Sequence, residues 1–302
     1  MNTQWLFKTT VPQTMDGKPL RYLLHHYWLL PKHLVFSLRS DERVLVNNRY
    51  LPVNFPVHFH DHISLTFIPS DFQHPFPQVL PDSAATLKIL YEDANLIVIN
   101  KRRGNKTHPN QPGEVGATIN HLAAYLKTKE ALPYMVHRLD QETSGAILFA
   151  KNPAVVPTLV AKIATKNIKR TYLAWVVGTD IDSQGIIDFP IGLDPNDKRK
   201  RMIDGNHPAK SITHYTVLQK EDGYSLLAVQ LETGRTHQIR VHLTAIGHPL
   251  VGDPLYNPDD KHPFLLLHSW KLNIPLPFSE QVIEITAPLP AHFDDFKLSL
   301  LK

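Results

Sequence analysis

The hydrophobic and polar positions divide the chain into a short first part and a longer second part rich in predicted strands. In the first part, helical spacing of leucines predicts a short helix over 20–24 and a second apolar helical face over 29–38, interrupted at Pro31. Residues 43–49 predict a strand, an Asn-containing turn and a second strand, and 62–67 alternate like a further strand. We therefore expect a small α+β unit at the N-terminus.

The second part contains more predicted strands than helices. Runs of β-branched, aromatic and alternating apolar residues predict strands at 87–93, 96–100, 171–178, 211–218 and 224–231. Helical spacing predicts helices at 119–126, 154–164 and 238–246. This order predicts an α+β domain whose mixed sheet is mainly antiparallel.

Four prolines gather between these two parts, at Pro69, Pro75, Pro77 and Pro81. Proline at this density disfavours helix and central strand and favours an extended connector. We therefore divide the chain into a domain at 1–68, a linker at 69–85 and a second domain at 86–302.

Composition narrows the classes of protein that remain. The 302 residues include no cysteine, which excludes a disulfide framework, a thiolate zinc site and a cysteine nucleophile. Residues 1–18 lack the pattern of a signal peptide, and no apolar run reaches the roughly 18 residues of a membrane helix. We expect a cytoplasmic protein without a membrane span, and the net charge of +4 mildly favours polyanionic partners.

The string HRLDQETSG at 137–145 is the most informative motif, because it places Asp140 two residues after Arg138 and just before an apolar run. It closely resembles the signature of RluA-type RNA pseudouridine synthases. The resemblance implies that Asp140 is the residue the reaction requires, that His137 contacts RNA, and that Arg138 helps to fill the gap left by a flipped uridine. Read alone, Arg138 is equally a simple phosphate contact.

A second motif, KRTYLA at 169–174, resembles the basic-x-Tyr-x-Ala strand of the same family. The resemblance implies that Tyr172 is a catalytic-site aromatic and that Arg170 contacts RNA. A flat ring there could stack on an extruded base. The alternative is an ordinary half-buried tyrosine on a strand.

A third motif, LETGRTHQIRVH at 231–242, resembles the family's third signature. By that resemblance Arg240 pairs with the catalytic carboxylate, which would favour its ionised form. Arg235, His237 and Gln238 are expected to contact RNA. Thr236 is expected to cap the N-terminus of the following helix. Without the resemblance, Arg240 would be interpreted as a solvated arginine on an amphipathic helix.

The resemblance extends over residues 86–290 and includes the segments 248–256 and 264–269. One leucine of 265–267 is expected to line the uracil pocket, but the pattern does not choose among them. The family's Lys-Pro-x-Gly is replaced by Lys-Arg-Arg-Gly at 101–104, in a loop expected to lie outside the site.

A basic run at 198–201 makes Lys198 and Arg199 candidate phosphate contacts, with a solvated loop as the alternative. The N-terminal unit resembles the ribosomal-protein-S-four-like RNA-binding module, with His60-Asp61 where that module often has Gly-Asp. The alternative is a small α+β domain with another use.

The resemblance implies an isomerase that needs no cofactor and no metal and that uses Asp140 either as nucleophile at C1′ or as base at C2′. Large-subunit ribosomal RNA is the expected target, transfer RNA the alternative, and a monomer the default state. Two other classes remain: an RNA-binding protein of the same fold without catalysis, and a metal hydrolase suggested by the histidine-rich string at 58–62.

Overall fold

The computed structural model describes the backbone of residues 3–75 and 77–300, and the side chains of these residues up to 296. The N-terminal unit is an antiparallel sheet in the order β1-β4-β2-β3. Its strands are β1 (Trp5–Thr10), β2 (Val44–Val46), β3 (Arg49–Tyr50) and β4 (His62–Phe67). The predicted hairpin and last strand are confirmed, whereas β1 was not predicted.

Two helical segments pack on this small sheet. Helix α1 (Leu20–Tyr22) continues into a π-helical turn over Leu23–Tyr27, and α2 (Lys32–Ser40) begins directly after Pro31. Leu34 and Leu38 on α2 are fully buried. The predicted break at Pro31 is therefore the boundary between the two helices, because proline is well tolerated at a helix start.

The larger sheet has ten strands. Eight follow one another in the order β10-β14-β15-β9-β16-β8-β6-β5, and two lie off this path, β17 paired to β16 and β7 paired to β8. Its members are β5 (Lys88–Glu92), β6 (Leu96–Lys101), β7 (Tyr134–Met135), β8 (Ser144–Ala150), β9 (Lys169–Val177), β10 (Gln184–Ile187), β14 (Thr213–Glu221), β15 (Tyr224–Leu231), β16 (Leu267–Pro275) and β17 (Val282–Thr286). Across the described ranges, the β8–β16 pairing is parallel and the other recorded pairings are antiparallel. The predicted fold class is confirmed.

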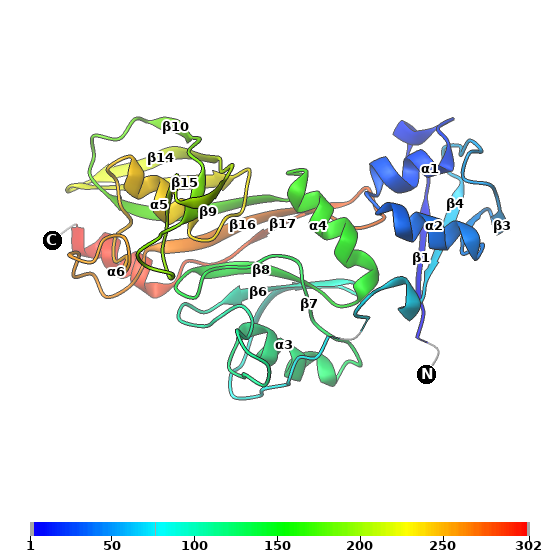
Figure 1. Ribbon diagram of the computed structural model, residues 1–302, viewed down its shortest axis with the longest axis horizontal. Helices are drawn as coiled ribbons and strands as arrows, with labels where there is room; N and C mark the ends of the chain where they lie inside the picture. Colours follow the sequence, from blue (N-terminus) through cyan, green and yellow to red (C-terminus); the bar gives the residue numbers. More distant parts are fainter. Residues whose placement is uncertain (1–2, 76, 301–302) are drawn as a thin grey trace.

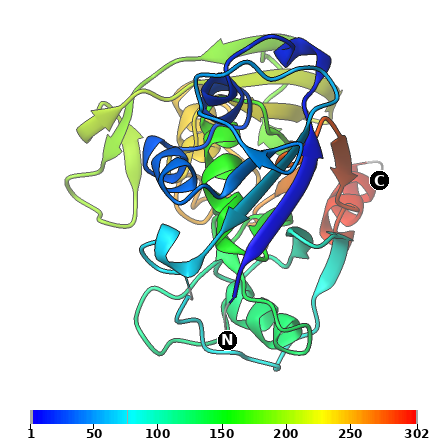
Figure 2. The ribbon, with the colours of Figure 1, turned by 90° about the vertical axis from the view of Figure 1, so that its right-hand side faces the viewer.

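A small separate sheet, β12-β11-β13, extends from the large one. It consists of β11 (Ile191–Leu193), β12 (Arg201–Ile203) and β13 (Asn206–Ala209). Figure 2, with the N-terminal unit facing the viewer, shows these yellow-green strands projecting to the left.

Helices α3 (Thr118–Lys127), α4 (Val156–Ala164), α5 (Gln238–Ala245) and α6 (Ala291–Leu300) accompany the large sheet (Figure 1). The first three match predicted helices to within a few residues. The pattern did not predict β8, although it recognised an apolar run there, because all seven of its residues are buried and no alternation remains to mark a strand.

Helix α4 joins the N-terminal unit to the large sheet (Figure 1). Thr158 on α4 is fully buried and its hydroxyl donates to the carbonyl oxygen of Trp28 at 3.0 Å. Phe278, from the β16–β17 turn, contacts the rings of Phe7 and Trp28 at centroid distances of 4.8 and 5.7 Å. The two sheets therefore share one continuous apolar core.

Thr158→Val should loosen this junction at nearly constant volume. The Trp28 carbonyl would lose its recorded side-chain donor, which we expect to lower the free energy of unfolding by about 1–2 kcal/mol. Urea denaturation measures the change, and Thr158→Ser, which keeps the hydroxyl, is the matched control. A loss as large in the serine variant would assign the effect to the methyl group.

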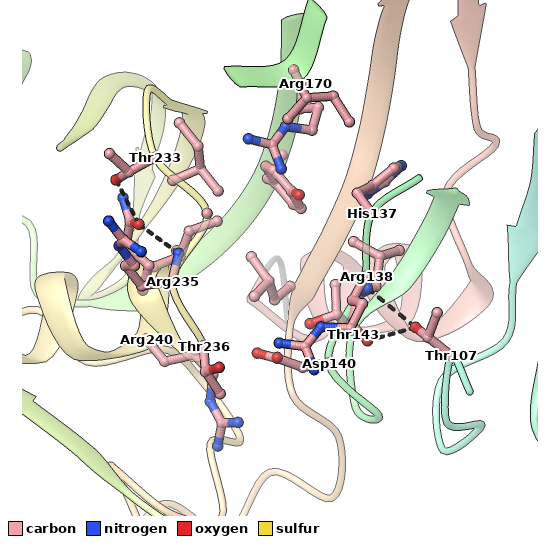
Figure 3. A pocket seen from close by; sticks show the side chains of 18 of the residues that line it. Thr107, His137, Arg138, Asp140, Thr143, Arg170, Thr233, Arg235, Thr236 and Arg240 are labelled. Atoms are coloured by element: carbon pink, nitrogen blue, oxygen red, sulfur yellow. Dashed lines mark hydrogen bonds between the residues drawn. The ribbon is translucent and has the colours of Figure 1, made fainter. Parts of the chain in front are cut away.

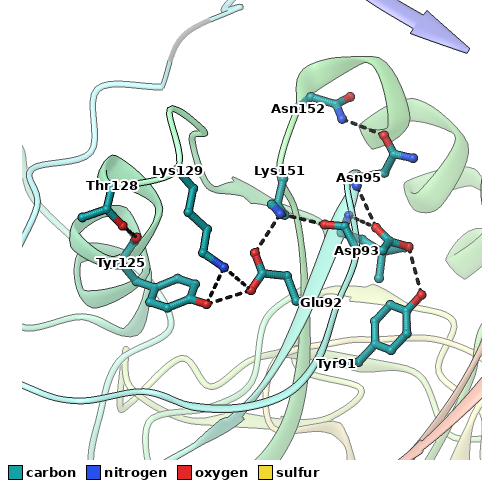
Figure 4. Close-up of polar contacts among 10 residues, drawn as sticks. Tyr91, Glu92, Asp93, Asn95, Tyr125, Thr128, Lys129, Lys151 and Asn152 are labelled. Atoms are coloured by element: carbon teal, nitrogen blue, oxygen red, sulfur yellow. Dashed lines mark hydrogen bonds and ion pairs between the residues drawn. The ribbon is translucent and has the colours of Figure 1, made fainter.

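Away from that junction, Glu92 at the end of β5 joins three elements (Figure 4). Its carboxylate accepts from Lys129 at 2.8 Å, from Lys151 at 2.7 Å and from the Tyr125 hydroxyl at 2.8 Å. Burial by itself would raise the pKa of Glu92, but these donors outweigh it and hold the pKa at about 2.

This cluster predicts acid sensitivity. Because the folded-state pKa lies below the ordinary value of 4.5, the stabilisation is complete above that value and is lost as pH falls towards 2. Glu92→Gln should therefore be less stable than the natural chain at neutral pH, and the difference should shrink at about pH 3. Urea denaturation at several pH values measures it; an equal difference throughout would contradict the prediction.

Candidate active site

A cavity of about 720 Å³ opens where the three sequence motifs meet. Its walls come from 106–110, 135–143, the start of β9, and 231–240 before and within α5. Figure 3 shows Asp140 on one wall and the segment carrying Thr233, Arg235 and Thr236 on the opposite wall. Segments far apart in the sequence thus form one pocket of a size suited to a small ligand.

Asp140 stands on a turn that is held from two sides. Thr107 donates its hydroxyl to the Leu139 carbonyl at 2.7 Å and accepts from the Leu139 amide at 3.1 Å (Figure 3). The ammonium of Lys101 donates to the Gln141 carbonyl at 3.0 Å. The backbone on either side of Asp140 is therefore fixed, as positioning of a reactive group requires.

Residues 101–104 are not among the residues that line the cavity, as expected, but Lys101 supports the turn that carries Asp140. Lys101 is only 2% exposed, and it also donates to the carbonyls of Arg102 and Asn105. Burial lowers the pKa of Lys101 to about 7, an effect that the nearby carboxylates of Asp140 and Glu142 oppose. The lysine of the Lys-Arg-Arg-Gly sequence at 101–104 was the sequence feature that could have indicated this supporting role.

Gly145 follows the Asp140 turn and meets β16 closely. It has a φ of +108°, and a Cβ there would lie 2.2 Å from the Ser269 carbonyl oxygen. Only glycine permits this parallel contact of β8 with β16, which explains the last letter of the 137–145 motif.

Tyr172 lies on β9 at the cavity wall and is 4% exposed. Burial raises the pKa of its hydroxyl, so the ring is neutral. Leu267, at the start of β16, is the leucine of 265–267 that lines the cavity. An aromatic ring and an aliphatic side chain thus border the same space, as suits a flat base.

His137 lines the cavity but is tied to β8. Its Nε2 accepts from the Leu148 amide at 3.1 Å, so the neutral ring carries its proton on Nδ1, which is buried without a partner. Burial, and then the charge of Arg170, lower the pKa of His137 to about 3. It is therefore a neutral group at physiological pH.

The expected ion pair between Arg240 and Asp140 is not recorded among the described residues, and this corrects the sequence-based interpretation. Arg240 instead donates from Nε and Nη2 to Asp253 at 2.8 and 2.7 Å, with side chains 3% and 0% exposed. Burial would lower the pKa of Arg240, but Asp253 and then Asp140 raise it. Asp140 therefore affects Arg240 through the electrostatic field of its negative charge, whereas Asp253 forms the ion pair with Arg240. Asp253 lies in the segment 248–256, whose resemblance to the family was the sequence feature that could have identified it.

One more expectation for this segment is corrected. Helix α5 begins at Gln238 after His237, whose φ is +59°, and Thr236 is not its cap. Gln238 is 2% exposed, and its amide oxygen accepts from the Thr233 hydroxyl and the Arg235 amide. Its amide nitrogen donates to Ile212 and Thr213. The side-chain amide of Gln238 therefore holds the loop, and the residue also lines the cavity.

His237 makes its recorded hydrogen bond outside the cavity wall. Its Nδ1 lies 2.9 Å from the Tyr256 hydroxyl, which also accepts from the Arg201 amide. Burial lowers the pKa of His237. The ring is thus bound to the segment that follows Asp253, and it is not among the residues that line the cavity.

The other basic candidates differ in position. Arg138 and Arg235 are exposed and line the cavity, and Arg170 lines it while buried. Lys198 and Arg199 lie on the loop between β11 and β12, outside the cavity wall, where Arg199 pairs with Asp197 at 2.8 Å. The structure therefore gathers three of the five at one site.

The histidine-rich string at 58–62 does not assemble a metal site. Within 3–75 and 77–300, no group of three or more potential His, Cys, Asp or Glu ligands is placed to hold a metal ion. None of the described helices is long and apolar enough to cross a membrane.

Two family models match the chain. The RNA pseudouridylate synthase model matches residues 95–245, and the model of the RluD ribosomal pseudouridine synthase N-terminal domain matches residues 7–63. The first range contains the motifs that carry Asp140, Tyr172 and Arg240.

Curated relatives and a solved structure agree. An uncharacterized RNA pseudouridine synthase of Bacillus subtilis, YlyB, is 36% identical over 83% of each chain. Ribosomal large subunit pseudouridine synthase D of Nitrosomonas europaea is 40% identical over 68% of this chain and 63% of its own. The structure of human RNA Pseudouridylate Synthase Domain Containing 4 aligns with a TM-score of 0.60 at 25% identity, covering 70% of this chain and 92% of that one.

Proposed function

This chain belongs to the RNA pseudouridylate synthase family, and from that premise we propose that Asp140 is the residue on which its isomerisation of uridine in RNA depends. The observation that carries the proposal is the position of Asp140. It is a carboxylate on a turn fixed by Thr107 and Lys101, at the wall of a cavity bordered by an aromatic ring.

The proposed reaction breaks the N1–C1′ bond of a uridine, rotates the uracil, and joins C5 to C1′. The proton leaves C5 and N1 gains one, so the atoms balance without a redox cofactor or metal. Asp140 attacks C1′ or removes the C2′ proton; both roles need the ionised carboxylate in contact with the sugar.

The neighbouring residues have separate proposed roles. Tyr172 stacks on the flipped base, and Leu267 borders it. Arg138, exposed at the rim, supports the flipped state. Arg240 stabilises the charge of Asp140 from its position on Asp253, and Arg235 contacts phosphate at the rim.

We propose large-subunit ribosomal RNA as the target, with transfer RNA as the alternative. The support is a relative's name, ribosomal large subunit pseudouridine synthase D, and the matched N-terminal model. In this proposal residues 1–68 form an S-four-like RNA-binding domain, 69–85 link it, and 86–302 hold the catalytic domain. Lys198 and Arg199 touch phosphate beyond the cavity, and the protein works as a cytoplasmic monomer.

The test is incubation of the purified chain with unmodified total RNA, followed by chemical labelling of pseudouridine and mapping of reverse-transcription stops. A new stop in 23S-type RNA supports the ribosomal target, and one in transfer RNA supports the alternative. A protein that binds RNA but produces no stop on RNA from intact or partly assembled ribosomes would be a non-catalytic binder of the same fold.

A further inference from the structure

Arg170 is a buried cation without a counter-ion. It is 7% exposed, its Nε is buried without a partner, and the described residues provide its guanidinium with no ion pair or hydrogen bond. Arg240, also buried, has Asp253. Arginine stays protonated in proteins, so an unpaired buried guanidinium is unfavourable until an anion reaches it.

The head group of Arg170 lies at the cavity, between β9 and the loop before α5. A Cβ on Gly234 would lie 3.4 and 3.7 Å from Nη1 and Nη2, so the guanidinium rests on bare backbone. Figure 3 shows the head group of Arg170 directed into the space that Asp140 also faces. The cation is therefore held ready at the wall of the site.

No carboxylate among the described residues lies within ion-pair distance of Arg170; Asp140 lines the same cavity but forms no ion pair with it. Glu232 borders the cavity but is already held by Lys166 and by His214, the latter at 2.7 Å. His137, beside Arg170, is neutral. A negative charge in direct contact with Arg170 must therefore come with the ligand.

We propose that Arg170 binds a backbone phosphate directly beside the uridine that enters the cavity. The ligand's identity as RNA rests on the proposed function. A phosphate carries the full negative charge that the guanidinium lacks and accepts two parallel hydrogen bonds from it. A uracil carbonyl would accept a bond but leave the charge uncompensated.

The first test measures binding of the pentanucleotide AAUAA, with Asp140→Asn as background to prevent turnover. Each phosphate flanking the uridine is replaced in turn by an uncharged methylphosphonate. With Arg170 present, one replacement should weaken binding about tenfold, and in Arg170→Met the same replacement should have less than about a twofold effect. Lys169→Met, which removes an exposed charge one residue away, should leave the tenfold loss intact.

The second test separates binding from a structural role. Removing an unpaired buried cation should stabilise the RNA-free protein, so we expect Arg170→Met to raise Tm by about 2–4 °C while it weakens RNA binding. Arg170→Lys, which keeps the charge but loses the fork, should show an intermediate loss of binding.

A lower Tm in Arg170→Met, or equal methylphosphonate effects with and without Arg170, would overturn the proposal. Its failure is distinguishable from failure of the proposed function, because AACAA is measured in parallel. Equal affinity for AACAA and AAUAA would count against uridine recognition, whereas phosphate coupling to Arg170 would stand in either RNA.

Discussion

Asp140→Asn is expected to abolish pseudouridine formation, with a loss of at least about 1,000-fold under single-turnover conditions. The amide keeps the shape of the side chain but can neither attack C1′ nor accept the C2′ proton. RNA affinity should stay within about threefold, because the exposed basic side chains at the rim supply most of the attraction to phosphate. Tritium release from C5-labelled RNA measures turnover, and filter binding measures affinity.

Glu142→Gln is the matched control for this variant. It makes the same chemical change two residues away, on a side chain that pairs with Arg103 and lies outside the cavity wall. We expect it to retain turnover within about threefold, since an ion pair more than a quarter exposed contributes little to stability. Persistent turnover in Asp140→Asn would remove Asp140 from its proposed role.

Asp253→Asn is expected to produce the largest loss of stability. It leaves the buried guanidinium of Arg240 without its counter-charge, which should lower the free energy of unfolding by about 3–5 kcal/mol. Asparagine retains an oxygen for the amides of Leu255 and Tyr256, which bond Asp253 in the natural chain, so those contacts are preserved. Urea denaturation followed by tryptophan fluorescence measures the change.

The double variant Arg240→Met with Asp253→Asn separates stability from catalysis. Removing both charges should recover most of the lost stability. Turnover should stay low, because the positive field at Asp140 is gone. If the double variant regained turnover as well as stability, Arg240 would be a structural residue alone.

Arg240 and Arg170, which both line the cavity, differ in whether a carboxylate of the protein pairs with them. Arg240 is satisfied within the protein, so its removal should destabilise the fold. Arg170 is unsatisfied, so its removal should stabilise the fold and weaken binding. The sequence placed both arginines in motifs but could not separate these roles, because each depends on which carboxylate lies nearby after folding.

The sequence by itself determined the local structure and the family. Helices α3, α4 and α5 and five of the ten strands of the larger sheet (β5, β6, β9, β14 and β15) follow from spacing that is set by neighbouring residues. The strings around Asp140, Tyr172 and Arg240 identified the chemistry, since their residue types and spacing are specific. Strands β1 and β16 were not predicted, because β1 pairs with β4 and β16 pairs with β8 and β9, which are distant in the sequence, and sheet formation depends on those partners. Strands β7, β8, β10 and β17 were also not predicted, although β17 pairs with its neighbour β16.

Only the tertiary structure decided the partners of the site residues. Asp253 pairs with Arg240, which lies 13 residues before it in the sequence. Lys101 donates to the Gln141 carbonyl, which lies 40 residues after it. Gln238 uses its side-chain amide to hold the loop before α5. The N-terminal unit shares its core with the large sheet through Thr158 and Phe278. Motifs record which groups the chemistry needs, whereas burial and competition among nearby donors and acceptors decide which groups meet.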